Sequence, residues 1–361
     1  MNSKDILVIH PYLKRKRINK DYFLEEAVNL VKAINLNCHD SILVGLDKIS
    51  SKTYFNKGFI RKIKLETSNT KIDLLLINTT LSPIQHRNLE KELNCKVLDR
   101  TNLILEIFGS RARSNEGKLS VMLASLEYQK SRLVRSWTHL ERQRGGAGFM
   151  GGPGEKQIES DRRQLTEKIN RLKKKIKNIT LSRNNQRYRR KKNKVPIISL
   201  IGYTNSGKST LFNKLTKSNV LSKDMLFASL DSTIRKSFFN NVNFLFVDTV
   251  GFIRDLPTTL IDAFKSTLDE IIYSDLILHV RDISSQYFSE QRNEVIKILH
   301  EIGIYDDDER IIEVINKVDL IKSLNTFHNS LNNQSVYVSA LSGEGIEELK
   351  TKISYKLPSL S

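Results

Sequence analysis

The sequence is poor in cysteine and has no long apolar runs. Only Cys38 and Cys95 occur in 361 residues, too few for a disulfide framework or a zinc site with paired ligands, so we expect two unreactive thiols. The apolar runs at 74–77 and 103–107 are far shorter than the roughly 18 residues of a membrane-spanning helix. The run at 6–9 is too short for a secretory signal. We expect a cytoplasmic protein without a membrane span, and leave peripheral membrane association open.

The positive charge is concentrated in the middle of the chain. Residues 111–194 hold 24 Lys and Arg against 7 Asp and Glu, whereas residues 1–110 carry a net charge of +6 and residues 195–361 one of −4. Of the 23 arginines, 13 lie in this middle segment, which a genome bias toward Lys would not produce. The segment therefore predicts contact with nucleic-acid phosphates rather than a merely solvated surface.

Hydrophobic patterns predict an α/β protein in three parts. In residues 1–110, short apolar runs alternate with amphipathic stretches, as in a parallel α/β domain, and Ser82-Pro83 indicates a helix start. Residues 111–194 predict a basic helical hairpin, because helical periodicity over 118–144 and 155–192 is interrupted by the glycine-rich segment 145–154. Residues 195–361 predict a third domain of the phosphate-loop type, for the reasons that follow.

A phosphate-binding motif follows the apolar strand at 197–201. The next eight residues match G-x-x-x-x-G-K-[ST] at every fixed position. Backbone N–H groups would cradle the phosphates, Lys208 would reach the β and γ groups, and the Ser209 hydroxyl would ligate Mg²⁺. The expected nucleotide contacts are Gly202, Tyr203, Thr204, Asn205, Ser206, Gly207, Lys208, Ser209 and Thr210.

Three further segments indicate GTP. Asp248 ends a strand and can hold Mg²⁺ through water, and the Gly251 N–H can reach the γ-phosphate. Asp319 can accept the paired donors of the guanine edge, which adenine does not present together. The segment 339–341 would close over the base. The expected contacts here are Asp248, Thr249, Val250 and Gly251; Asn316, Lys317, Val318 and Asp319; and Ser339, Ala340 and Leu341.

Beyond these motifs, the chain resembles the HflX family of GTPases. The most specific matches are Arg144-Gly-Gly-Ala-Gly, Gly152-Pro-Gly-Glu155 and Glu159-Ser-Asp-Arg-Arg163. The resemblance implies a GTPase that binds the large ribosomal subunit, reaches rRNA at the peptidyl-transferase region with its glycine loop, and helps split stalled ribosomes under stress. The ribosome contacts it implies are Arg144, Gly145, Gly146, Gly148, Phe149, Met150, Gly152, Pro153, Gly154, Arg162 and Arg163.

The sequence departs from the family pattern in two places. The switch segment commonly has threonine in its third position, but here it is Phe227, Ala228, Ser229, Leu230 and Asp231. The hydroxyl on Mg²⁺ therefore falls to Ser229, with Thr233 as the alternative. Some members carry a further domain after the GTPase domain, and this chain ends at Ser361, so we expect that domain's function to be absent.

The residue after Gly251 is not expected to take part in GTP hydrolysis, so we expect other groups to assist the reaction. Many relatives orient the attacking water with a glutamine after the switch glycine, but Phe252 follows Gly251 here and cannot hydrogen-bond through its ring. We expect slow hydrolysis that the ribosome accelerates, with Lys208, Asn205 and Gly251 as catalytic residues. Asn205 occupies the position that resembles K⁺-using GTPases, which makes K⁺ a second candidate cofactor beside Mg²⁺.

Two other functions stay open from the sequence. A GTPase that assists assembly of the large subunit would use the same residues, and a GTP-dependent signalling or scaffolding switch would use the basic hairpin only as a spacer. The +17 charge of residues 111–194 argues against the second of these. We expect a monomer whose partners are GTP or GDP and the large ribosomal subunit.

Overall fold

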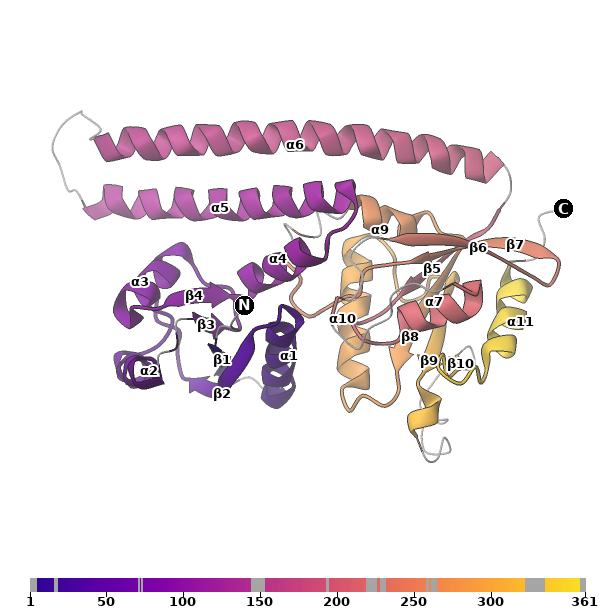
Figure 1. Cartoon of the computed structure of the whole chain (residues 1–361), viewed down its shortest axis with the longest axis horizontal. Coiled ribbons are helices and arrows are strands. Elements are labelled where there is room, and N and C mark those ends of the chain that lie inside the picture. Colours follow the sequence, from indigo (N-terminus) through magenta and orange to yellow (C-terminus); the bar gives the residue numbers. More distant parts are fainter. Residues whose placement is uncertain are drawn as a thin grey trace. The chain divides into compact units, whose positions relative to one another are not determined.

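The first part of the chain folds around a four-stranded parallel sheet with strand order β2-β1-β3-β4 (Figure 1). Strand β3 is buried over its whole length, as expected for a parallel strand covered on both faces. The strands are β1 (Asp5–Leu13), β2 (Asn37–Leu46), β3 (Leu74–Ile77) and β4 (Lys96–Asp99), and the helices are α1 (Lys20–Ala33), α2 (Lys57–Thr70), α3 (Pro83–Leu93) and α4 (Arg100–Arg111).

Local sequence explains where α3 begins. The Ser82 hydroxyl accepts from the Gln85 backbone N–H at 3.2 Å, and the Gln85 side chain accepts from the Ser82 N–H at 2.9 Å. Together with Pro83 in the first turn, this capping box satisfies backbone donors that the helix leaves unpaired. The predicted helix start is confirmed.

Asp99, the last residue of β4, and Arg100, which follows it, hold two helices through polar contacts. Arg100 is buried and donates to Glu26 Oε2 on α1 at 2.8 Å. Asp99 is fully buried and accepts from the Tyr128 hydroxyl at 2.7 Å and from Arg132 at 2.8 Å. Burial and the neighbouring Asp99 carboxylate raise the pKa of Tyr128, so that its hydroxyl remains a donor. Asp99 and Arg100 thus hold α5 and α1 at one edge of the sheet.

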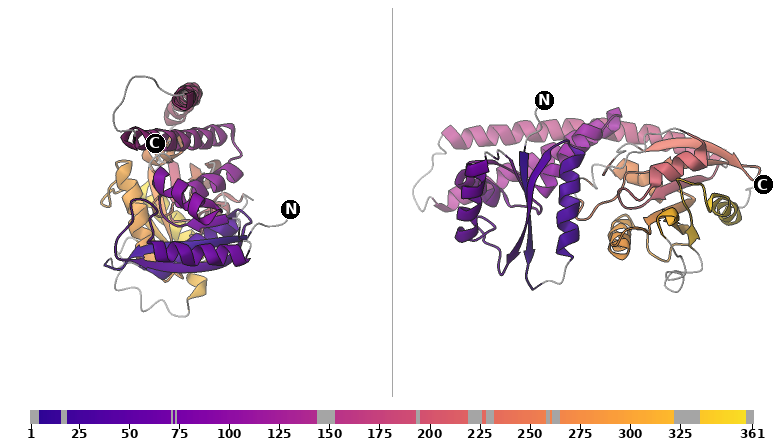
Figure 2. Two further views of the ribbon diagram at one scale, coloured as in Figure 1. Left: turned by 90° about the vertical axis from the view of Figure 1, so that its left-hand side faces the viewer. Right: turned by 60° about the horizontal axis from the view of Figure 1, so that its bottom comes forward.

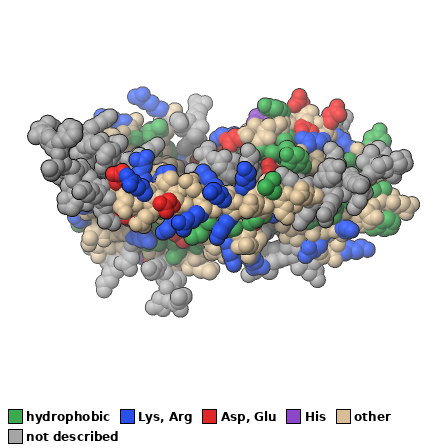
Figure 3. Space-filling model, turned by 90° about the horizontal axis from the view of Figure 1, so that it is seen from above, with side chains coloured by type: hydrophobic (Ala, Val, Ile, Leu, Met, Phe, Trp, Pro, Cys, Tyr) green, Lys and Arg blue, Asp and Glu red, His purple; other side chains and the backbone are tan. Residues whose placement is uncertain are grey.

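The basic segment forms two long helices, α5 (Asn115–Gln143) and α6 (Pro153–Lys192), which run side by side in the views of Figures 1 and 2. Lys173 on α6 pairs with Glu127 on α5 at 2.7 Å, and Ile169 and Leu172 are buried on the apolar side of α6. Lys and Arg side chains gather along α6 (Figure 3). Pro153 and Gly154 belong to the first turn of α6 rather than to the predicted loop, because proline suits the first helical position.

A second, six-stranded sheet has strand order β10-β9-β8-β5-β7-β6 and is parallel except for β6, which runs antiparallel to β7. Its core contains Phe212, Phe244 and Phe246. The strands are β5 (Ile197–Ile201), β6 (Thr233–Phe239), β7 (Val242–Asp248), β8 (Leu276–Asp282), β9 (Ile311–Asn316) and β10 (Val336–Tyr337); the helices are α7 (Lys208–Thr216), α9 (Lys265–Ile272), α10 (Phe288–Glu301), η1 (Val318–Leu320, a 3₁₀ turn) and α11 (Ile346–Lys356).

The computed structural model describes residues 5–15, 19–70, 72, 74–143, 153–192, 195–218, 226–227, 232–257, 260, 265–321 and 335–357. The chain divides into two compact units: residues 1–110 with 119–175, and residues 111–118 with 176–361. Both long helices therefore belong partly to each unit. Within the ranges just given, no helix is both long and apolar enough to cross a bilayer.

Candidate nucleotide-binding site

The phosphate loop turns from β5 into α7 around a buried lysine. Lys208 Nζ donates to the carbonyl oxygens of Gly202 at 3.1 Å and Tyr203 at 2.7 Å. Burial lowers the pKa of Lys208 to about 8, an effect that the Asp248 carboxylate partly opposes. The phosphate loop thus surrounds the Lys208 ammonium group. An anion bound beside this group would favour its charged form.

Ser209 and Asp248 meet at the start of α7. The Ser209 hydroxyl donates to Asp248 Oδ2 at 2.7 Å, and Asp248 is 1% exposed. Burial raises the pKa of Asp248, whereas the Ser209 hydrogen bond and Lys208 lower it. Asp248 Oδ1 is buried and has no hydrogen-bond partner among the described residues. An oxygen of this kind suits a hard cation or its bound water.

The segment after Asp248 is paired with the phosphate loop. The Thr204 N–H donates to the Phe252 carbonyl at 2.8 Å, and the Phe252 N–H donates to the Gly202 carbonyl at 3.0 Å. A Cβ at Gly251 would lie 3.0 Å from Lys208 Nζ and 2.9 Å from Thr204 Cγ2, so this close approach requires glycine. The Phe252 ring is 2% exposed and Val250 is partly buried. The Thr249 hydroxyl donates to the Leu200 carbonyl at 2.6 Å.

Asn316 connects the phosphate loop to the predicted base loop. Its Nδ2 donates to the Ser206 carbonyl at 2.9 Å, and its Oδ1 accepts from the Ala340 N–H at 3.0 Å. A Cβ at Gly207, whose φ is +90°, would lie 2.1 Å from Asn316 Nδ2. Glycine is therefore required there both for the backbone conformation and for the approach of Asn316.

The other residues predicted to contact the base lie in the same unit, at the carboxyl ends of β9 and β10. Asp319 is exposed, whereas Val318 and Ala340 are buried. Lys317 Nζ pairs with Asp282 at the end of β8, at 2.6 Å. Ser339 is fully buried and its hydroxyl accepts from the Ser342 N–H, while Leu341 is 77% exposed. The Asp319 carboxylate is thus accessible to a ligand.

The switch segment lies partly within the described residues. Phe227 is 2% exposed with a φ of +55°, and Ala228, Ser229, Leu230 and Asp231 lie outside the described residues. Thr233 begins β6 directly opposite Asp248 in the antiparallel register. Thr210 is partly buried on α7, and Asn205 is exposed with a φ of +63°.

The predicted ribosome contacts fall mainly outside the described residues. Arg162 and Arg163 are exposed on α6, where Arg163 pairs with Glu159 at 2.9 Å. Pro153 and Gly154 begin α6. The others lie outside the described residues: Arg144, Gly145, Gly146, Gly148, Phe149, Met150 and Gly152.

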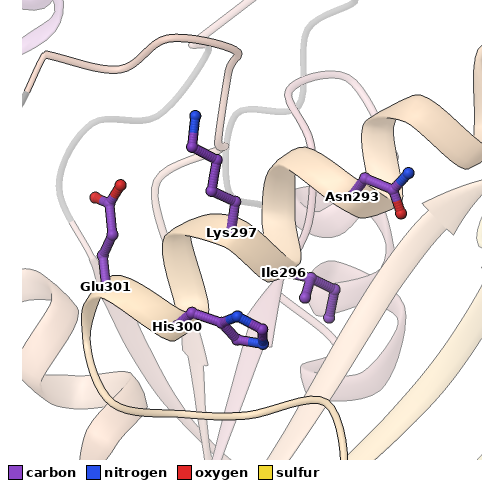
Figure 4. Close-up of a pocket in the computed structure, with 5 residues that line it drawn as sticks. All are labelled: Asn293, Ile296, Lys297, His300 and Glu301. Carbon is purple, nitrogen blue, oxygen red and sulfur yellow. The ribbon is translucent and has the colours of Figure 1, made fainter.

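A separate open hollow of about 540 Å³ lies along α10 (Figure 4). It is lined by Asn293, Ile296, Lys297, His300 and Glu301, all from one helix. None of the predicted nucleotide contacts lines it, so we assign it no part in the site.

Comparison with known proteins agrees with this geometry. Three family models match consecutive parts of the chain: GTP-binding GTPase N-terminal over residues 21–109, GTP-binding GTPase middle region over 111–190, and 50S ribosome-binding GTPase over 197–317. The GTPase HflX of Magnetococcus marinus is 46% identical over 332 residues, spanning 91% of this chain and 76% of that protein. The chain belongs to the HflX GTPase family.

A second curated relative and a solved structure support the same family and fold. The GTPase HflX of Escherichia coli is 39% identical over 361 residues, spanning 98% of this HflX-family chain and 83% of that protein. Among solved structures, the complex of SsGBP with GDP has a TM-score of 0.52 and 28% identity, covering 98% of each chain. The α/β fold predicted for this HflX-family chain, with its helical hairpin and phosphate-loop GTPase domain, is confirmed.

Sequence reasoning missed two features of the site. It assigned Asn316 to the base and did not anticipate that this side chain braces the phosphate loop. It also missed Asp282, the partner of Lys317. Asp282 could have been found, because the carboxyl ends of the adjacent parallel strands β8 and β9 must meet at one edge of the sheet.

Proposed function

We propose that the protein hydrolyses GTP, binds the large ribosomal subunit, and splits or remodels stalled ribosomes under stress. The proposal rests mainly on Asn316, whose side chain hydrogen-bonds both to the phosphate loop and to the predicted base loop. The same chain carries a strongly basic helical hairpin. We also propose the three-part organisation 1–110, 111–194 and 195–361, a monomeric state and a cytoplasmic location.

Guanine selection is proposed for Asp319. Its exposed carboxylate lies on η1, in the segment that Asn316 begins, and it can accept two hydrogen bonds from the guanine edge. Lys317, held by Asp282, and the exposed Leu341 are placed at neighbouring strand ends and complete the proposed base contacts. The phosphate contacts are proposed for the backbone of 202–210 and for Lys208.

Mg²⁺ fits the residues present. Ser209 and Asp248 would hold it, because the hydroxyl and carboxylate already meet and Asp248 has a buried oxygen without a partner among the described residues. When bound, Mg²⁺ neutralises charge on the β- and γ-phosphates. We propose that a second protein hydroxyl, from Ser229 or Thr233, also binds Mg²⁺. The position of Thr233 opposite Asp248 supports Thr233.

Hydrolysis is proposed to depend on a partner. Lys208 stabilises negative charge on the phosphates, and the Gly251 N–H senses the γ-phosphate. The buried Phe252 ring supplies no group that orients water. The ribosome would supply this help by ordering the switch segment, and K⁺ beside Asn205 would add positive charge. Asn205 is exposed, as such a role requires.

The hairpin is proposed to bind rRNA. On α6 the described cations Arg162, Lys168, Lys174, Lys175 and Lys177 are exposed and have no ion-pair partner among the described side chains. Free cations along a helix bind phosphates through release of counterions. The glycine-rich segment 145–154 would reach the peptidyl-transferase region.

The test measures dissociation of intact ribosomes by light scattering in the presence of a GTP analogue. We expect the full-length protein to dissociate ribosomes and a deletion of residues 145–154 to bind nucleotide normally while losing this activity. Arg171→Ala is a matched control, because Arg171 already pairs with Glu167.

Two results would contradict the proposal. Dissociation by the deletion variant at the wild-type rate would contradict the proposed role of residues 145–154 in reaching the peptidyl-transferase region. Binding to precursor large subunits but not to mature ones would favour the assembly GTPase instead.

A further inference from the structure

Two side-chain hydroxyls of the phosphate loop are buried and have no hydrogen-bond partner among the described residues. They belong to Thr204, which is 5% exposed, and Ser206, which is 1% exposed. Burying a hydroxyl that makes no hydrogen bond costs free energy, so an apolar side chain would suit the ligand-free loop better. A polar group of this kind therefore calls for an explanation in terms of what it binds.

The two hydroxyls lie at different places in the loop. A Cβ at Gly202 would lie 3.0 Å from Ser206 Oγ, so the Ser206 hydroxyl lies against the start of the loop. A Cβ at Gly251 would lie 2.9 Å from Thr204 Cγ2 and 3.0 Å from Lys208 Nζ. The Thr204 side chain and the Lys208 ammonium group thus flank the same point beside Gly251. Of these two residues, Thr204 is the one whose side chain meets the segment assigned to the γ-phosphate.

The backbone donor of Thr204 is already engaged. Its N–H donates to the Phe252 carbonyl at 2.8 Å. In phosphate loops, backbone N–H groups commonly bind the phosphate oxygens. Because this N–H has another acceptor, the hydroxyl is the group through which Thr204 can donate to a phosphate. A hydrogen bond to a charged oxygen is stronger than one between neutral groups, so it would offset the cost of burying the hydroxyl.

We propose that the Thr204 hydroxyl donates to an oxygen of the third phosphate of GTP and so favours GTP over GDP. A phosphate bound by Lys208 and by the Gly251 N–H lies beside this hydroxyl, because the Thr204 side chain meets both groups at one point. The β-phosphate is left to the backbone of the later loop residues and to the start of α7. The hydroxyl therefore acts on the phosphate that GDP lacks. This inference rests on the GTP hydrolysis and phosphate contacts of the proposed function, but not on its ribosome role.

The test compares the affinities of the full-length protein for GDP and for a non-hydrolysable GTP analogue by calorimetric titration with Mg²⁺ present. Thr204→Val removes the hydroxyl and keeps a methyl group against Gly251. It should lower the affinity for the GTP analogue by roughly 10- to 100-fold, as expected for loss of a hydrogen bond to a charged group, and leave GDP affinity unchanged. Thr204→Ser keeps the hydroxyl and should retain the wild-type ratio of the two affinities. Thr216→Ala is the matched control, because the Thr216 hydroxyl donates to the Phe212 carbonyl.

Urea unfolding of the ligand-free protein separates binding from folding. Thr204→Val should be at least as stable as the wild type, because it loses a buried hydroxyl that has no partner among the described side chains and backbone groups. The proposal is overturned if Thr204→Val binds the GTP analogue as tightly as the wild type does. It is also overturned if both affinities fall by the same factor, as a general defect of the loop would produce. Should Thr204→Val fail to fold, Thr204→Ala decides by the same two affinities.

Failure of this inference and failure of the proposed function give different results. If Thr204→Val keeps the wild-type affinities while the wild type dissociates ribosomes, the role of the hydroxyl fails and the proposed function stands. If Thr204→Val is impaired for the GTP analogue alone while the wild type dissociates no ribosomes, the ribosome role fails and the role of Thr204 stands.

Discussion

The Asn316 side chain braces the Ser206 carbonyl of the phosphate loop at 2.9 Å. The same amide accepts from the Ala340 N–H, so one buried side chain fixes two loops that are far apart in the sequence. Its role is distinct from that of Asp319, which is exposed and available to the base. The two residues of one motif should therefore respond differently to substitution.

Asn316→Ala should weaken GDP and GTP binding equally, by roughly 10- to 100-fold. Loss of its two buried hydrogen bonds leaves the Ser206 carbonyl and the Ala340 N–H without partners, at about 1–3 kcal/mol. Asp319→Asn should instead reduce the preference for GDP over ADP. Calorimetric titrations of both variants check this, and a pure change of base preference in Asn316→Ala would contradict the bracing role.

Nucleotide-free protein should become more stable between pH 8 and pH 10.5. Because burial lowers the pKa of Lys208 from 10.5 to about 8, the unfolded chain binds more protons than the folded one in this window. The contribution is roughly 3 kcal/mol at most. Urea unfolding at several pH values measures it, and Lys208→Met should show a smaller rise. Equal slopes for the two proteins would refute the assignment.

Ser209→Ala should raise the Mg²⁺ concentration needed for tight GTP-analogue binding, by roughly tenfold for one lost ligand. The hydroxyl that meets Asp248 is removed, while the backbone of the phosphate loop is retained. Thr216→Ala is the matched control, because its hydroxyl on the same helix donates to the Phe212 carbonyl. An unchanged Mg²⁺ requirement in Ser209→Ala would exclude Ser209 as a ligand.

Phe252→Gln should not speed GTP hydrolysis by the free protein. The ring is buried, so an amide there loses apolar contacts and should destabilise the fold by about 3 kcal/mol or more. Single-turnover hydrolysis and urea unfolding test the two effects. Phe238→Gln is the control. Because Phe238 is 65% exposed, this substitution should change the free energy of unfolding by less than about 0.5 kcal/mol. Faster turnover in Phe252→Gln would contradict the burial argument.

Asp99→Asn should destabilise the first compact unit by roughly 3 kcal/mol, because Arg132 loses its ionic partner beside a fully buried group. GDP affinity should not change, since Asp99 lies in the other unit from the phosphate loop. Thermal unfolding with and without GDP separates the two units. A parallel loss of GDP affinity would show that they are not independent.

The features of the fold and site that could be predicted depend mostly on short-range patterns in the sequence. The phosphate loop follows from fixed spacing, and the start of α3 follows from Ser82, Pro83 and Gln85, because such signals depend on neighbours in the chain. The helices α2 and α4 were not anticipated. The contact of Asn316 with Ser206 joins residues far apart in the chain and depends on strand order, and no local pattern in the sequence indicates it.

The division of both long helices between two units affects how the protein can be cut into pieces. A fragment that starts at residue 195 contains the whole six-stranded sheet but lacks Arg183 and Glu116. Glu270, 3% exposed in the full chain, would lose the Arg183 guanidinium that lies 3.9 Å from it. The compact unit that holds this sheet is therefore discontinuous in sequence, because it also includes residues 111–118 and 176–192.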